Sequence, residues 1–283
     1  MRRARTILPW VLTLVALLSI PLAAAQQDEA PAVSVDPLHK PLDTLLNQDV
    51  RDGRVYYAAL KQQRATLDHY VASLDGPAVA GFATWTADAR LAFWLNAYNA
   101  FVLQTVINHY PIRGTSSKYP RSSIRQIPGA FDRLQHRAAG RSVTLDQIEQ
   151  QILPTFNDPR VFLALGRGAL GSGRLRSEAF SSTRLEQQLA AVRAECLDQV
   201  QCAQVDRVAG VVNISPIFSW DAASFITKYG PEASTAYPGR SAIEAAVLTY
   251  ISGDLLGTEK AFLKANTFRV VYETFDWRLN DLR

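Results

Sequence analysis

The stretch TADARLAFWLNAYNAFVLQTVINH, residues 86–109, carries the strongest helical pattern of the chain. Its apolar and aromatic side chains recur three and four residues apart, which is the spacing of one face of an α-helix. The residues that follow this spacing are Leu91, Trp94, Leu95, Tyr98, Val102 and Thr105. Tyr110-Pro111 predicts the end of the helix, because a residue before proline avoids the helical conformation. We therefore predict a largely buried helix over residues 86–109.

Two asparagines interrupt the apolar surface of this helix. Asn96 and Asn99 lie three residues apart and so share a face. Asparagine is a mediocre helix former, and a buried amide must find hydrogen-bond partners. We expect both amides to bond to the backbone of a neighbouring loop, either residues 163–180 or the connection over residues 112–130.

Outward from this helix, the chain combines many helices with few strands. Thr144-x-x-Gln147 and Thr183-x-x-Glu186 have the spacing of capping boxes and predict two helix starts. Before residue 86 we predict a short helix in 38–50, a turn at Asp52-Gly53 with a brief extended piece, and a helix over 58–74. After residue 111 we predict little regular structure over 112–142, a helix over 144–153, a strand over 160–165, a helix over 183–197, a hairpin over 203–215, helices in 216–230, 241–250 and 258–265, and a closing strand in 267–277. The predicted fold class is α+β, a helix-rich single domain with a small, mostly antiparallel sheet.

The N-terminus has the three-part layout of a secretory signal peptide. Three arginines precede an apolar stretch over residues 7–24, and Ala23-Ala24-Ala25 supplies small residues at a cleavage position. We expect cleavage after Ala25, an exported protein found in the periplasm or outside the cell, and no membrane span in what remains. An uncleaved anchor is the alternative. We expect residues 26–37 to form a flexible lead and residues 38–283 to form one domain.

The composition argues against a nucleic-acid partner and against a bound metal or cofactor. The formal charge of +4 falls to +1 without residues 1–25, because that segment holds three arginines and no acids. A basic nucleic-acid footprint is therefore not supported. The four histidines show no metal-ligand spacing, so we expect no metal site and no cofactor.

The two cysteines lie close together in the sequence. Cys196 and Cys202 are separated by five residues. An even, close pair in an exported chain predicts a disulfide that closes a turn. Two independent buried thiols are the alternative, and neither cysteine has a nearby histidine that would make it a nucleophile.

The segment LALGRGALGSGRLRSEAF, residues 163–180, contains a G-x-G-x-x-G pattern after an apolar run. A dinucleotide loop would open a helix at its third glycine, but Ser-Gly-Arg-Leu-Arg-Ser follows Gly171 and does not predict one. Ser172 also lacks the glycine offsets of a nucleophile elbow. We interpret the glycines as a source of backbone freedom at a sharp bend.

Three arginines accompany this bend. Arg167, Arg174 and Arg176 bring positive charge to it, so the bend suits an anion. The structural alternative is that these arginines pair with Glu178, Glu149 or Asp158 and brace the fold. In the anion hypothesis Glu178 orients one arginine while the others stay free and at least one faces Asn96 or Asn99.

Seven segments, taken in order, resemble the bacterial and plant proteins of the domain of unknown function family 547. The resemblance runs from about Leu42 to Asn280. The segments are DGRVYYAAL, FWLNAYNAFVLQTVINHYPI, LDQIEQQIL, DPRVFLAL, LRSEAF, VVNISPIFSW and FDWRLN. The resemblance implies a compact domain similar to the papain and transglutaminase group of cysteine hydrolases, without an established activity for the family at large.

This chain departs from the family pattern at the positions that would carry catalysis. The resemblance places the family's first cysteine at Arg167, its serine at Ala169 and its second cysteine at Ser172. It places one histidine at Phe162 and another at Gln150. The expected thiols and imidazoles are therefore replaced.

Two functions follow as hypotheses. The first is an exported, non-catalytic binding or scaffold domain whose degenerate hydrolase-like cleft binds a small anion, a peptide or an envelope component. The alternative is a hydrolase or acyl-transferase that uses Ser172, with His136 or His109 as its base, or an unrecognised acid in that cleft. The predicted ligand-binding residues are Asn96, Asn99, Arg167, Ser172, Arg174, Arg176 and Glu178.

Overall fold

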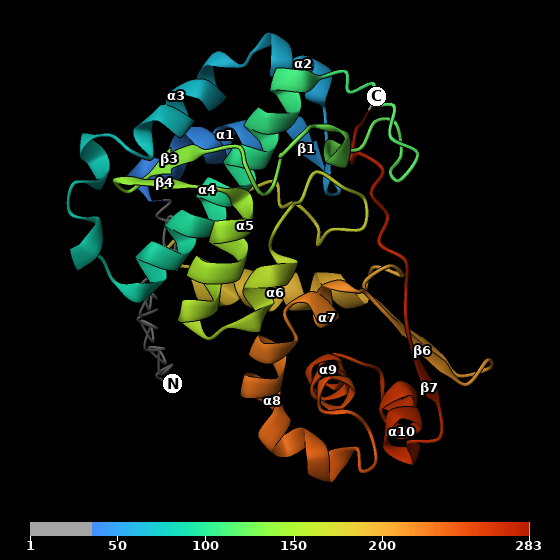
Figure 1. Ribbon diagram of the computed structural model, residues 1–283. Helices are drawn as coiled ribbons and strands as arrows, with labels where there is room; N and C mark the ends of the chain where they lie inside the picture. Colours follow the sequence, from blue (N-terminus) through green and yellow to red (C-terminus); the bar gives the residue numbers. More distant parts are fainter. Residues whose placement is uncertain (1–35, 283) are drawn as a thin grey trace, which may run out of the picture. The chain divides into compact units, whose positions relative to one another are not determined.

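The computed structural model describes residues 36–282, and the predicted signal peptide and nearly all of the predicted lead lie outside this range. The described residues form a helix-rich α+β fold, as predicted, but their strands form three small sheets and not one. α4, Ala87–His109, runs through the part of the fold formed by the first half of the chain (Figure 1). Thr86 accepts a hydrogen bond from the Ala89 amide at its start, and Tyr110-Pro111 follows its end. Sixteen of its side chains are buried, which confirms the predicted buried helix.

The chain before α4 packs around it. η1 (Pro37–His39) and α1 (Lys40–Asp49) lead into the hairpin of β1 (Val50–Arg51) and β2 (Arg54–Val55), whose turn is Asp52-Gly53 as predicted. α2 (Tyr57–Gln62), α3 (Ala65–Ser73), η2 (Pro77–Val79) and η3 (Phe82–Thr84) follow. The single helix predicted over 58–74 is wrong. The chain breaks at Gln63, and Arg64 then bonds both Asp68 in α3 and Asn108 in α4, which fixes a new helix direction.

The connection after α4 holds more regular structure than predicted. It contains η4 (Ile124–Gln126) and an antiparallel hairpin of β3 (His136–Ala138) and β4 (Arg141–Val143). Ala139 and Gly140 form the hairpin turn with positive φ angles. Next come α5 (Leu145–Gln147), the π-helical turn η5 (Ile148–Ile152) and η6 (Leu153–Phe156). The capping box at Thr144 and Gln147 is present as predicted.

The strand predicted over 160–165 is wrong. Residues Pro159–Leu163 form a 3-10 helix, η7, which Asp158 caps by accepting a hydrogen bond from the Arg160 amide. The apolar run is buried without pairing in a sheet, and periodicity alone does not separate these two cases. The next helix, α6 (Leu185–Leu197), begins two residues after Thr183 and has no side-chain cap, so the second predicted capping box is also wrong.

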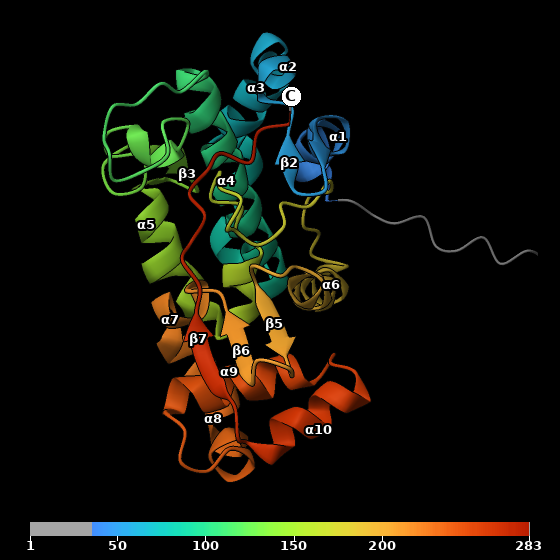
Figure 2. The ribbon, with the colours of Figure 1, turned by 90° about the vertical axis from the view of Figure 1, so that its right-hand side faces the viewer.

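The last third of the chain builds a mixed sheet with helices beside it (Figure 2). β5 (Ala203–Asp206) pairs antiparallel with β6 (Val211–Ile214), and β7 (Arg269–Tyr272) pairs parallel with β6. The helices of this part are α7 (Ile217–Trp220), α8 (Ala222–Ala236), α9 (Ala242–Ser252) and α10 (Gly257–Ala265). The one helix predicted in 216–230 is thus two, which meet at Asp221. No helix within residues 36–282 has the length and apolar character to cross a membrane.

The chain then returns to its beginning. After β7 the segment 273–282 runs back to the β1–β2 hairpin (Figure 2), where Val55 and Asp281 form a parallel bridge. On the way, Leu170 donates its amide to Arg278 and Gly171 donates to Asp276. The C-terminal segment therefore holds both the hairpin and the glycine-rich loop in place.

Candidate functional site

The two asparagines of α4 hold the glycine segment, which we define as residues 163–180. The Asn96 amide donates to the Phe180 carbonyl and accepts from the Phe180 N–H, both at 2.8 Å. Asn99 donates to the Ala164 carbonyl at 3.2 Å and accepts from the Gly166 N–H at 2.8 Å. Both side chains are buried. These contacts confirm the predicted role, and they use the amides for structure rather than for a ligand.

The glycines let this segment fold tightly on itself. A Cβ atom at Gly173 would lie 1.6 Å from the Leu163 carbonyl oxygen, and Gly168 has a φ of +66°. Any larger residue at Gly173 would therefore collide with backbone. No helix starts after Gly171, since the next one is α6 at Leu185. The segment lacks the helix N-terminus on which a dinucleotide loop depends.

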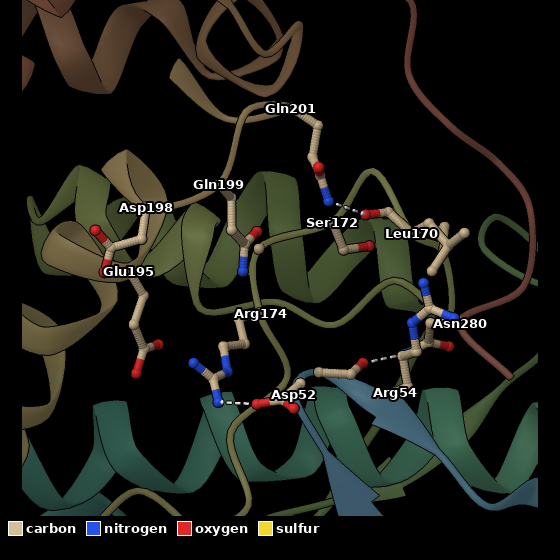
Figure 3. A pocket seen from close by; sticks show the side chains of 13 residues that line it. Asp52, Arg54, Leu170, Ser172, Arg174, Glu195, Asp198, Gln199, Gln201 and Asn280 are labelled. Atoms are coloured by element: carbon tan, nitrogen blue, oxygen red, sulfur yellow. Dashed lines mark hydrogen bonds and ion pairs between the residues drawn. The ribbon is translucent and has the colours of Figure 1, made fainter. Parts of the chain in front are cut away.

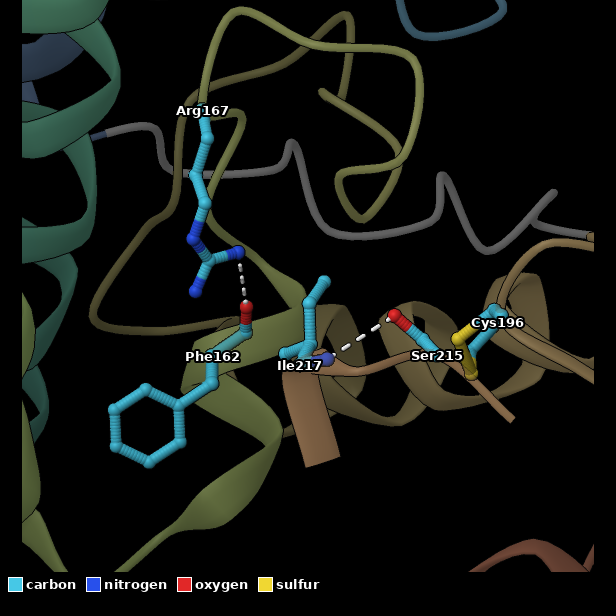
Figure 4. The surroundings of a disulfide bond; sticks show 6 residues. Phe162, Arg167, Cys196, Ser215 and Ile217 are labelled. Carbon is cyan, nitrogen blue, oxygen red and sulfur yellow. Dashed lines mark hydrogen bonds between the residues drawn. A yellow bond between two sulfur atoms is a disulfide. The ribbon is translucent and has the colours of Figure 1, made fainter. Parts of the chain in front are cut away.

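Arg167 is buried at the centre of the segment, with 1% of its surface exposed. It forms a two-pronged ion pair with Glu149 at 2.5 Å, and its Nη1 donates to the Phe162 carbonyl at 3.0 Å (Figure 4). The Tyr98 hydroxyl donates to the same carboxylate at 3.0 Å. Burial disfavours the charge of Arg167, but the Glu149 carboxylate outweighs it and holds the pKa of Arg167 above its ordinary value. The guanidinium has no free edge for a ligand.

The other two arginines of the segment are also paired. Arg174 bonds Asp52 at 2.8 Å, and Arg176 bonds both Glu178 at 2.6 Å and Glu195 at 2.8 Å. Glu178 does orient Arg176, as predicted, and it accepts from Arg184 as well. The expectation of a free arginine beside Asn96 or Asn99 is wrong, because each of the three guanidinium groups meets a carboxylate. The bracing alternative describes these arginines.

Ser172 borders a polar cavity of about 310 Å³, which we call the Ser172 cavity (Figure 3). The serine is 6% exposed, and its Oγ accepts a hydrogen bond from the Arg167 amide at 3.0 Å. The cavity is lined by residues of β1–β2, the glycine segment, the end of α6 and the C-terminal segment, and no histidine is among them. His109 bonds the Thr105 carbonyl, and His136 stacks on Phe101.

The predicted disulfide is present in the structure. Cys196 at the end of α6 bonds Cys202 just before β5, with Cα atoms 5.2 Å apart (Figure 4). Gln199 and Gln201 lie in the closed ring and line the Ser172 cavity, where Gln201 donates to the Leu170 carbonyl at 3.2 Å (Figure 3). The disulfide thus fixes one wall of that cavity.

A second cavity was not predicted from the sequence. It has a volume of about 380 Å³, and we call it the Trp220 cavity. Its lining residues are Arg125, Phe131, Asp146, Glu149, Gln150, Arg167, Trp220 and Asp221. They come from η4, the connection after it, α5, η5, the glycine segment and the α7–α8 junction, so no local motif unites them. The features that mark it, the π-helical turn η5, of a kind common at functional sites, and the helix boundary at Asp221, are visible only in the structure.

The Trp220 cavity holds both charge and aromatic surface. The Arg125 guanidinium lies 4.3 Å from the Phe131 ring and 4.4 Å from the Trp277 ring, and it takes part in none of the ion pairs within residues 36–282. Trp220 is 45% exposed and packs on Phe275 and Trp277. Arg125 and Trp220 line the same cavity, in which the Arg167 guanidinium lies 5.6 Å from the Trp220 ring.

The free carboxyl groups of the Trp220 cavity are hard to ionise. Burial raises the pKa of Asp221 to about 7, with the Glu149 carboxylate adding to the effect and Arg167 opposing it. Burial also raises the pKa of Asp146, which Arg125 partly offsets. Carboxyl groups with shifted pKa values in a cavity mark a candidate functional site. The described part of the chain contains no cluster of three or more His, Cys, Asp or Glu arranged to hold a metal ion.

Comparisons with known proteins identify one relationship. No curated protein and no solved structure matches the chain. One family model matches part of it, and the matched stretch contains α4, both asparagines, Glu149, Gln150 and the glycine segment. Residues 82–196 thus match the family described as "Protein of unknown function, DUF547", in support of the resemblance noted in the sequence.

Proposed function

We propose that this protein is an exported, non-catalytic binding domain whose ligand, a small anion or a peptide, occupies the Trp220 cavity. The cavity is a degenerate form of a cleft like that of the papain and transglutaminase group. The disulfide is compatible with export, because such bonds persist in oxidising compartments.

The Arg167–Glu149 ion pair is the main support for a non-catalytic role. The resemblance assigns the family's first cysteine to Arg167 and its two histidines to Phe162 and Gln150. These positions lie together here, since Arg167 bonds the Phe162 carbonyl and lines the same cavity as Gln150. A charged guanidinium is no nucleophile, and no lining residue of the cavity is a cysteine or histidine. The arrangement supports binding over covalent catalysis.

The alternative function, acyl transfer by Ser172, has less support. A serine nucleophile needs a base within hydrogen-bond reach. Ser172 accepts a backbone hydrogen bond, and the lining of its cavity includes no imidazole. A Ser172→Ala variant that loses a hydrolytic activity of the wild type would reverse this preference.

In this proposal Arg125 binds the anionic group of the ligand. Contact with the Phe131 and Trp277 rings restrains the guanidinium, and no carboxylate within residues 36–282 forms an ion pair with it, so its donors remain available to an anion. A cavity of about 380 Å³ is within the size range of small-molecule sites. A small anion or the end of a peptide therefore fits both its size and its charge.

The test is a thermal-shift screen of the protein against anions, peptides and glycans. A bound ligand stabilises the folded state by mass action and raises the unfolding midpoint. We expect an anion or peptide to raise the midpoint of the wild type and to lose most of this effect in Arg125→Gln. Arg121→Gln is the matched control, because Arg121 is exposed on the same connection and does not line the cavity.

Two results would contradict the proposal. The first is a screen in which no compound shifts the wild-type midpoint. The second is recovery of a chemically altered compound after incubation with the protein, measured by mass spectrometry, since a binding domain returns its ligand unchanged.

A further inference from the structure

Asp221 occupies a helix N-cap position without capping the helix. It precedes α8, and aspartate at this position usually accepts a hydrogen bond from an amide of the first turn. Here the side chain makes no capping bond and lines the Trp220 cavity instead. Its Oδ2 atom is buried and has no hydrogen-bond partner among the described residues. A buried acceptor without a partner is costly unless something else satisfies it.

The charged neighbours of Asp221 leave this carboxyl unneutralised. Arg167 spends its donors on Glu149 and on backbone carbonyls. Arg125, in η4, also lines the cavity, and its guanidinium lies against two aromatic rings. Glu149 and Asp146 add negative charge from η5 and α5. The cavity therefore has one cation, Arg125, and two acids, Asp146 and Asp221, that form no ion pair within residues 36–282, and Trp220 precedes Asp221 in the sequence.

We propose that Asp221 receives the cationic nitrogen of the ligand while Arg125 receives its anionic group, so that the ligand is a zwitterionic peptide fragment or amino-acid derivative. This inference rests on the proposed function and narrows its ligand class. The Asp221 carboxylate can bind an ammonium group through charge-assisted hydrogen bonds. The Trp220 ring, which the Arg167 guanidinium already approaches at 5.6 Å, offers apolar contact to the carbon chain of the ligand. The ligand nitrogen would supply the hydrogen bond that Oδ2 lacks.

Binding of a cation to Asp221 requires the ionised carboxylate, and this sets a pH signature. Because burial raises the pKa of Asp221 to about 7, most of this carboxyl is protonated at pH 6 and most is ionised at pH 8. Affinity for a cationic ligand therefore rises roughly tenfold over this interval. A ligand that used only its anionic group would show the opposite trend, because a protonated Asp221 can donate to an anion.

Titration calorimetry with three lysine derivatives tests the inference. Nα-acetyl-lysine carries a carboxylate and an ammonium group whose charges are constant between pH 6 and pH 8. Nα,Nε-diacetyl-lysine lacks the cation, and Nα-acetyl-lysine amide lacks the anion. We expect Nα-acetyl-lysine to bind most tightly, with roughly tenfold higher affinity at pH 8 than at pH 6, and each blocked derivative to bind at least several-fold more weakly.

Two variants test whether Asp221 causes the preference for the ammonium group and the pH dependence of binding. Asp221→Asn keeps the size of the side chain and should remove both the preference for the ammonium group and the pH dependence. Asp198→Asn is the control, because it removes an exposed carboxylate that lines the Ser172 cavity instead. Thermal midpoints measured without ligand verify that both variants fold.

The outcomes separate this inference from the proposed function. Equal affinity for Nα-acetyl-lysine and its diacetyl form overturns the role of Asp221 and leaves an anion-binding domain. Binding that survives in Asp221→Asn with its pH dependence intact also overturns it. If none of the three derivatives binds, the assigned ligand class is wrong, and the thermal-shift screen decides the proposed function separately.

Discussion

At the scale of single residues, Arg167 and Glu149 form the buried ion pair on which the fold depends most. Both are buried, and the pair joins the glycine segment to η5. Removing one partner of a buried pair leaves an uncompensated charge, which costs about 3–5 kcal/mol. We expect Glu149→Gln to lower the free energy of unfolding by about this amount, measured by urea denaturation.

Arg174→Ala provides the comparison for this prediction. Its ion pair with Asp52 is exposed, and such pairs contribute about 1 kcal/mol or less. Similar losses in the two variants would mean that Arg167 and Glu149 are no more important to the fold than a surface pair.

Asp221 should oppose stability at neutral pH. A carboxyl whose pKa rises from 3.8 to about 7 on folding stabilises the folded state at low pH, and this contribution is lost as pH rises through 7. Asp221→Asn does not titrate, so its stability relative to the wild type should increase between pH 4 and pH 8. The gain is at most about 4 kcal/mol.

Unfolding midpoints of both proteins, measured across this pH range, check the prediction. A difference between the two proteins that stays constant with pH would show that Asp221 titrates normally and that its carboxyl is not desolvated. A more stable variant with weaker ligand binding would identify Asp221 as a residue kept for function.

The sequence allowed correct predictions for residues whose contacts follow from their position in a nearby element. The spacing of Asn96 and Asn99 on a buried helix placed two amides that needed backbone partners, and both were found in the glycine segment. The sequence left the state of the arginines open between an anion site and a brace, with Glu149 and Glu178 among the candidate partners. It could not decide between the two, because Asp52 and Glu149 lie 122 and 18 residues away from the arginines that they bond. The Trp220 cavity was missed for the same reason.

At the scale of elements, helices with strong caps or periodicity were predictable and short apolar runs were not. α4 and the Thr144 capping box have the predicted positions. η7 was predicted as a strand, because five apolar residues in a row fit a buried strand or a buried helical turn equally well. Its nature is decided by Asp158 and Pro159, which cap and start a 3-10 turn.

The disulfide links two elements, and its loss should have a moderate effect on stability. The ring between Cys196 and Cys202 joins α6 to β5. Closing so short a loop contributes roughly 2 kcal/mol in the chain-entropy model. We expect Cys196→Ser/Cys202→Ser to fold and to lose about this much stability in urea denaturation.

Mass spectrometry after alkylation tests the bond itself. The native, unreduced protein should take up no alkylating agent at the two cysteines, and the reduced protein should take up two equivalents. Two thiols that alkylate freely without reductant would contradict the disulfide.

At the scale of the whole molecule, the two ends of the described chain support each other. Asn280 accepts from the Tyr57 hydroxyl and donates to the Gly53 carbonyl, contacts that span more than 220 residues. The sequence indicates the fold class through its helices and its few strands. It does not indicate this closure, because no local pattern encodes a pairing between the first hairpin and the last segment.

The central claim is that the Trp220 cavity binds a ligand, and the indole N–H signal of Trp220 tests it most directly. This signal can be assigned in the ¹⁵N-labelled protein by comparison with Trp220→Phe and followed during titration with Nα-acetyl-lysine at pH 8. We expect it to shift to saturation with the dissociation constant found by calorimetry, while the signal of Trp85, which lines a different cavity, stays in place. A Trp220 signal that does not move while the ligand still binds would contradict the account.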